Sequence, residues 1–99
     1  MSIDTVYRSF CVYLTESGIA QVFSRCDGVA CAFSGGADSA LLLTLLRRYC
    51  LKNGYPLTAI HVHHGIRGRT ADSDAAFCEA FCAARNIPFR LCCVDVPQY

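Results

Sequence analysis

The stretch CAFSGGADS (residues 31–39) decides how the rest of this chain can be arranged. A short apolar, β-compatible run over residues 28–33 leads into it, and a leucine-rich run over residues 40–49 follows. Residues 34–39 therefore lie where a buried strand meets the N-terminus of a helix. The first N–H groups of a helix lack intrahelical acceptors, and the helix dipole adds partial positive charge there. Because glycines also let the backbone approach a ligand closely, the sequence predicts a phosphate-binding loop.

Asp38 is the unusual member of this loop, because a carboxylate repels phosphate unless a cation lies between them. It therefore indicates a bound Mg²⁺ that bridges the carboxylate and phosphate oxygens. The alternative is that Asp38 only caps the helix, which is a frequent role for aspartate. The five fixed residues of the pattern favour the binding site, since at ordinary residue usage they match by chance at roughly one in 10⁶ starting positions. They are Ser34, Gly35, Gly36, Asp38 and Ser39.

The loop differs from the two common nucleotide loops. The pattern G-x-x-x-x-G-K-[ST] requires a lysine that is missing here, and G-x-G-x-x-G is also absent. The order S-G-G-x-D-S resembles instead the PP-loop of the N-type ATP pyrophosphatases. The resemblance implies cleavage of ATP between its α- and β-phosphates, which leaves an adenylated intermediate. It also implies that ATP phosphates are held by Ser34, Gly35, Gly36, Ala37, Asp38 and Ser39, with Mg²⁺ at Asp38.

Composition limits the chain to one small unit. With 99 residues, a formal net charge of +1 and 54% hydrophobic residues, it has room for one core. The near-neutral charge gives no global attraction to nucleic acid, so any RNA contact is expected to be local. No stretch is long enough to cross a membrane. The first residues lack the features of a signal peptide, so the eight cysteines are expected to be reduced thiols in a cytoplasmic protein.

The pattern of apolar residues predicts an α/β fold. Residues 1–27 are interpreted as a helical lead-in: a first helix capped by Asp4, with Gly18 after its end, and a shorter helix that stops near residues 27–28. Residues 28–96 are interpreted as a βαβαβ core. Because strands joined by a helix form right-handed parallel crossovers, we expect a partial doubly wound parallel sheet of about three strands. Its expected strands cover residues 28–33, 57–62 and 89–94. One expected helix begins at residue 40 and ends at residues 53–54, and a second is capped by Thr70 or Asp72 and ends near Asn86.

A second group of polar residues follows the predicted strand 57–62. His61, His63 and His64 lie at its end, with Arg67 and Arg69 just after. In a parallel sheet this segment opens on the same edge as the phosphate-binding loop. Three interpretations stay open: a zinc site, which would need further ligands, a polar loop without chemistry, and a contact to phosphate or nucleotide, which arginine and histidine can both make.

Cys78 and Cys82 are four positions apart and share one face of the last predicted helix. Two cysteines on one face could begin a metal site. Zinc sites, however, favour closer pairs with a second pair elsewhere, and Phe77 and Phe81 beside them make this face a core stripe. We therefore expect these thiols to be small core residues.

Four patterns together resemble the N-terminal part of the tRNA(Ile)-lysidine synthetase family. They are S-G-G-x-D-S, the strand end H-V-x-H-G-x-R, a helix with D-x-D and a cysteine eight positions later, and the turn I-P-F. The resemblance covers about residues 28–95 and has one departure, since the family usually carries asparagine at the position of His63. It implies a ligase that uses ATP to adenylate a cytidine in the anticodon of an isoleucine tRNA. Lysine then displaces AMP, so that the tRNA reads AUA instead of AUG.

The same resemblance assigns expected roles. The expected catalytic residues are Asp38, His64 and Arg67. Asp38 is expected to act through Mg²⁺, and His64 and Arg67 are expected near the α-phosphate or the target base. ATP, lysine and tRNA(Ile) are the expected partners.

The resemblance further implies that the chain is a truncated fragment, inactive alone, of an adenine-nucleotide alpha-hydrolase-like domain. In the family's strand order 3-2-1-4-5 the first strand is central, so its free edge would favour self-association. The alternatives are another PP-loop enzyme such as a tRNA thiolase, a non-catalytic adenine-nucleotide-binding module, and a piece without ligand affinity.

Overall fold

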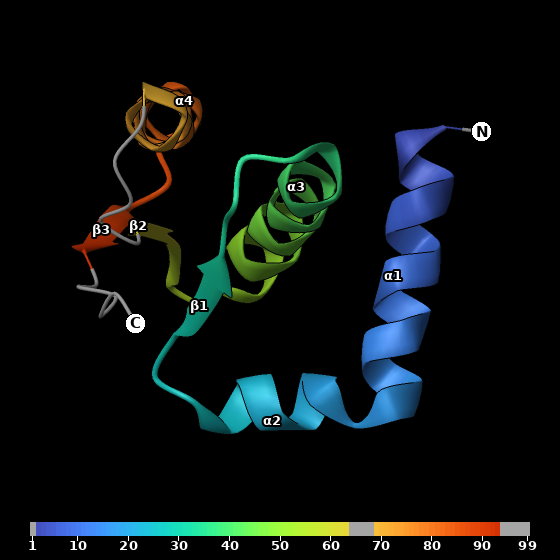
Figure 1. The fold of residues 1–99 in the computed structure, drawn as a ribbon. Coiled ribbons are helices and arrows are strands. Elements are labelled where there is room, and N and C mark those ends of the chain that lie inside the picture. Colours follow the sequence, from blue (N-terminus) through green and yellow to red (C-terminus); the bar gives the residue numbers. More distant parts are fainter. Residues whose placement is uncertain (1, 64–68, 94–99) are drawn as a thin grey trace, which may run out of the picture.

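A computed structural model of the chain shows a three-stranded sheet with helices packed on it (Figure 1). The structure describes residues 2–63 and 69–93. In chain order the elements are α1 (Ile3–Ser17), α2 (Ile19–Arg25), β1 (Val29–Ala32), α3 (Ala37–Asn53), β2 (Leu57–His63), α4 (Arg69–Ala84) and β3 (Phe89–Cys93).

The sheet has the order β1-β2-β3, and both pairs of strands are parallel. This confirms the predicted α/β class and the predicted parallel sheet of about three strands. Helix α3 packs on β1 and β2, and α4 packs on β2 and β3. Along β1, Val29 and Cys31 are buried, whereas the alternate residues Ala30 and Ala32 are exposed. The two helices therefore cover one face of the sheet, and in the described part of the chain β1 is an edge strand.

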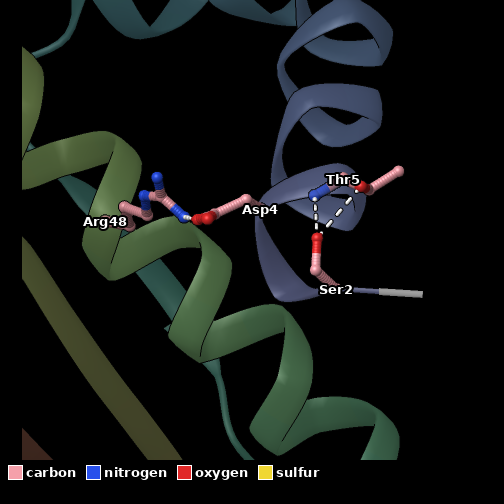
Figure 2. Close-up of polar contacts among 4 residues, drawn as sticks. All are labelled: Ser2, Asp4, Thr5 and Arg48. Atoms are coloured by element: carbon pink, nitrogen blue, oxygen red, sulfur yellow. Dashed lines mark hydrogen bonds and ion pairs between the residues drawn. The ribbon is translucent and has the colours of Figure 1, made fainter.

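The predicted cap of α1 is wrong by two residues. Ser2 is the N-cap, and its Oγ accepts a hydrogen bond from the amide of Thr5 at 3.3 Å (Figure 2). Asp4 lies in the first turn instead, where a carboxylate suits the helix dipole. Its Oδ1 accepts a hydrogen bond from Nη1 of Arg48 on α3 at 2.8 Å, so Asp4 ties the lead-in to the core (Figure 2).

Arg48 also covers a buried aromatic ring. Its guanidinium carbon lies 4.1 Å from the ring centroid of Tyr7, a distance typical of a cation–π contact. Burial raises the pKa of Tyr7 to about 12. The end of α1 is as predicted: Gly18 adopts φ +85° and its amide donates to the carbonyl of Thr15, after which α2 begins.

Both core helices begin earlier than predicted. Helix α3 starts at Ala37 instead of residue 40, and Gly54 with φ +74° ends it as expected. Helix α4 starts at Arg69, so Thr70 and Asp72 belong to the helix and do not precede it. None of the helices in the described part of the chain is long and apolar enough to span a bilayer.

Four thiols lie in the core between the sheet and its helices. We refer to them as the buried cysteines: Cys31, Cys50, Cys78 and Cys82. Burial raises the pKa of all four, so at neutral pH they are neutral thiols. This matches the expectation that cysteine serves here as a small core residue.

Candidate phosphate-binding site

Residues 34–39, which we call the phosphate loop, comprise the last residues of the connection after β1 and the first three residues of α3 (Figure 1). Gly35 adopts φ +95°, a backbone conformation that side chains disfavour. Gly36 has extended dihedral angles and is the N-cap of α3, where it supplies no side-chain hydrogen bond. The two glycines thus have different roles. Gly35 makes the turn, and Gly36 leaves the N-terminus of α3 without a covering side chain.

The amides at the start of α3 are the donors that the loop offers to an anion. The amide of Ala40 is bonded to the carbonyl of Gly36 at 2.9 Å and closes the first helical turn. The amides of Ala37, Asp38 and Ser39 come before that bond, and helix geometry leaves them without an intrahelical acceptor. They point out of the helix end where the dipole is positive, as the sequence predicts.

The hydroxyls of Ser34 and Ser39 form hydrogen bonds within the loop. Ser34 Oγ accepts a hydrogen bond from the amide of Gly36 at 3.3 Å and lies 3.0 Å from Ser39 Oγ. Ser39 Oγ in turn donates to the carbonyl of Gly36 at 3.0 Å. These bonds order the loop before any ligand arrives, and a bound phosphate would compete for the hydroxyl donors.

Asp38 lies in the first turn of α3 and is exposed. Within the described part of the chain it forms no ion pair, so its carboxylate can accept a cation. A carboxylate is an oxygen donor, which suits Mg²⁺, and Ser39 next to it in the sequence carries a hydroxyl. The expected metal position at Asp38 therefore fits the residues present.

The structure describes two of the three histidines that the sequence groups together. His61 is buried, and its Nδ1 lies 2.8 Å from the carbonyl oxygen of Phe33, the residue just before the loop. His63 is half-buried at the end of β2. His64 and Arg67, two of the expected catalytic residues, lie outside the described residues. Among residues 2–63 and 69–93, no group of three or more potential metal ligands comes together.

Sequence reasoning missed the contribution of α4 to the loop. A Cβ atom placed on Gly35 would lie 3.1 Å from Sγ of Cys78 and 3.6 Å from Cδ2 of Phe77. Helix α4 thus packs directly behind the turn. The sequence correctly marks Cys78 as a core residue, but nothing in its local pattern indicates a contact with a residue 43 positions earlier.

A sequence profile of the PP-loop domain matches residues 13–98. The chain belongs to the PP-loop family. This PP-loop chain is 46% identical over 69 residues to a tRNA(Ile)-lysidine synthase from Azoarcus sp. (strain BH72), which covers 70% of this chain and 15% of that protein. A tRNA(Ile)-lysidine synthase from Vibrio vulnificus (strain YJ016) is 37% identical over 89 residues, or 90% of this chain and 19% of that protein. The chain therefore spans less than a fifth of the length of these relatives.

Solved structures show the same PP-loop fold. An NH3-dependent NAD synthetase from Campylobacter jejuni, solved with a nitrate ion, superposes with a TM-score of 0.62 and 26% identity over 93% of this chain and 36% of that one. A U34-tRNA thiolase from Methanococcus maripaludis superposes with a TM-score of 0.55 and 33% identity over 67% of this chain and 22% of that one. These similarities confirm the predicted fold class and the predicted family.

Proposed function

We propose that this chain is the ATP-binding part of a tRNA(Ile)-lysidine synthase, an ATP-dependent ligase that modifies tRNA. In the proposed reaction a bond forms between an anticodon cytidine and the α-phosphorus of ATP, and the bond to the β-phosphate breaks. Pyrophosphate leaves, and lysine then takes the place of AMP on the cytidine. The observation that carries the proposal is the Gly35–Gly36 turn that opens onto the bare N-terminus of α3, in a chain 46% identical to such a synthase over 69 residues.

In this proposal the loop binds the pyrophosphate end of ATP. The amides of residues 37–39 donate to β- and γ-phosphate oxygens, and Gly35 and Gly36 allow the phosphates to approach the backbone. Ser34 and Ser39 exchange their mutual hydrogen bond for bonds to phosphate. A Mg²⁺ held by Asp38 would neutralise part of the phosphate charge.

Catalysis in this scheme is positioning and charge neutralisation, so no side chain acts as a nucleophile. The loop amides hold the leaving pyrophosphate where negative charge develops. His64 and Arg67 are proposed to stand near the α-phosphate or the target base, where arginine can pair with phosphate oxygens in a two-pronged manner. Lysine and tRNA(Ile) are the proposed further substrates, and the cytoplasm is the proposed location.

Calorimetric titration of the chain with ATP and Mg²⁺ tests the binding step. We expect binding that weakens at least tenfold in Asp38→Asn and loses its dependence on Mg²⁺. Asp27→Asn removes the same charge from an exposed position at the opposite end of β1 and should leave binding unchanged. A wild-type chain that does not bind ATP with Mg²⁺ would contradict the proposal.

The ligase assignment needs a second experiment. A chimera in which this chain replaces the matching segment of the Azoarcus synthase should release pyrophosphate from ATP only when isoleucine tRNA is present, and should release AMP only when lysine is present as well. Pyrophosphate release without that dependence would point to another PP-loop enzyme. Binding of ATP with an inactive chimera would point to a nucleotide-binding module.

A further inference from the structure

The carbonyl of Phe33, the last backbone group before the phosphate loop, is held by two side chains. Phe33 still follows the sheet, since its amide donates to the carbonyl of Ile60 at 2.8 Å. Its carbonyl oxygen lies 2.8 Å from Nδ1 of His61 on β2. It also accepts a longer contact of 3.8 Å from Sγ of Cys78 on α4. A carbonyl oxygen has two acceptor positions, so both contacts can form together.

The geometry fixes the proton on the imidazole of His61. A carbonyl oxygen cannot donate, so Nδ1 must carry the hydrogen in the 2.8 Å bond. His61 is only 7% exposed, and a polar group at that depth is costly unless its hydrogen bond is made. The Sγ of Cys78 lies 3.5 Å from the same nitrogen, which places the two side chains against each other.

Cys78 supports the loop a second time, at Gly35. Its Sγ would lie 3.1 Å from a Cβ at Gly35, so it already fills the space behind the turn. Cys78 is fully buried and sits on a helix, which gives it little freedom to move away. The phosphate loop is therefore held at its entry by His61 and Cys78 and at its turn by Cys78 again.

We infer that His61 and Cys78 are positioning residues that set the conformation of the phosphate loop from behind. His61 directs the carbonyl of Phe33 inward, so that the chain leaves β1 with the next amides turned toward the ligand side. Cys78 sets how close the turn at Gly35 can come to α4. The effect on ATP binding rests on the proposed function, whereas the effect on the shape of the loop does not.

A purely structural role predicts a different result. A buried histidine that only satisfies its own hydrogen bond would change the stability of the fold and leave the loop as it is. A positioning role predicts that the amide signals of the loop and the affinity for ATP differ between variants of equal stability. The experiment must therefore measure the loop and the stability separately.

The wild-type chain supplies the first measurement. Nitrogen-15 spectra of the His61 ring should show that Nδ1 carries the proton and that this proton is hydrogen-bonded. A ring protonated only on Nε2 cannot donate to Phe33 and would overturn the inference without any substitution.

Variants of His61 supply the second. His61→Phe keeps the ring and removes the donor, and we expect it to shift the amide signals of Gly35 and Gly36 in the chain without ligand. ATP binding should weaken about tenfold, equivalent to about 1.4 kcal/mol. His61→Asn places an amide donor near the position of Nδ1 and should restore binding to within about threefold of wild type. Unchanged glycine signals in a folded His61→Phe variant would overturn the inference.

A matched pair of cysteine variants supplies the third. Cys78→Leu and Cys82→Leu make the same change at two fully buried positions of α4, one turn apart. Cys78 is the one that contacts the carbonyl of Phe33 and lies behind Gly35, so Cys78→Leu should alter the loop signals and ATP binding more than Cys82→Leu at equal loss of stability. Equal effects would overturn the inference. Failure of the wild-type chain to bind ATP would contradict the proposed function, while the loop signals would still decide the positioning role.

Discussion

Replacing Gly35 by alanine should destabilise the chain for two separate reasons that the structure allows us to divide. Gly35 has φ +95°, and a side chain in left-handed backbone costs about 1–2 kcal/mol. The new methyl group would also lie 3.1 Å from Sγ of Cys78, closer than ordinary contact. Overpacking of this kind in a filled core typically costs about 1–3 kcal/mol. Alanine returns about 0.4–1 kcal/mol by restricting the unfolded chain. The expected net loss is about 2–3 kcal/mol.

Two other glycines provide the control for backbone strain. Gly18 and Gly54 have φ +85° and +74°, and a Cβ at either would have no neighbour within 4 Å. Alanine at these positions should cost about 1 kcal/mol, the strain without the contact. The double variant Gly35→Ala with Cys78→Ala removes the contact but keeps the strain. We expect the double variant to lose about 1 kcal/mol less in free energy of unfolding than the sum of the losses in the two single variants.

The measurement is the free energy of unfolding in urea for the wild type, the three glycine variants and the double-variant cycle. The reasoning requires Gly35→Ala to lose clearly more stability than Gly18→Ala or Gly54→Ala. If all three lose the same amount, or if the cycle shows no coupling, α4 does not press against the turn. The two-part account of the loop would then be wrong.

Three further predictions concern the rest of the fold. Burial raises the pKa of the buried cysteines, so in alkaline solution the folded chain keeps thiol protons that the unfolded chain loses. The free energy of unfolding should therefore be constant up to about pH 8 and fall as the pH rises further. Urea unfolding from about pH 7 to 10 measures this change. Asp4→Asn should cost less than about 1 kcal/mol, since both partners of its ion pair are exposed, and Arg48→Ala should cost more because it also loses the contact with the ring of Tyr7. High salt should reduce most of the loss in Asp4→Asn but only the ion-pair part of the loss in Arg48→Ala. Finally, sedimentation velocity should show concentration-dependent self-association through the edge of β1. The amide of Val29 donates to the carbonyl of Pro56, just before β2, and the amide of Phe33 donates to Ile60 on β2. Because backbone amides alternate in direction along a strand, the amide of Ala30 faces the free edge, and Ala30→Pro should abolish association while the sheet remains. A well-folded wild-type monomer at high concentration would contradict this prediction.

The strand, loop and helix around residues 34–39 were predictable because the signals are local. An apolar run, two glycines and a leucine-rich run determine each other's structure over about twenty neighbouring residues. The start of α3 was placed three residues late because Ala37, Asp38 and Ser39 carry no apolar periodicity, although all three fit a first helical turn. The order of the three strands followed from the short connections and the handedness of crossovers.

The errors arise where distant parts of the chain decide between local alternatives. Ser2 and Asp4 are both good caps, and the choice depends on Arg48, which lies 44 positions away and engages the carboxylate of Asp4. The sequence groups His61 with His63 and His64, which leaves three interpretations of the group open and does not reveal what His61 itself contacts. Its partner is the carbonyl of Phe33, 28 positions earlier, and a pairing of this kind leaves no mark in local spacing.

The position of β1 explains why the loop depends so much on side chains. In doubly wound sheets a strand that leads to a ligand site is commonly flanked by two others, whose ladders hold both of its sides. Within the described residues β1 has four residues and pairs only with β2, so its ladder supports the loop from one side. The remaining constraints on the loop come from that same side, through His61 on β2 and Cys78 on α4. A second strand added along the free edge of β1, from any source, would hold the backbone directly, and the sensitivity of the loop to His61→Phe should then decrease. The conformation of the loop and the pairing at the edge of β1 should therefore depend on each other. The loop signals of His61→Phe should depend on whether the edge is paired, and Ala30→Pro, which blocks that pairing, should make the loop more sensitive to the loss of His61.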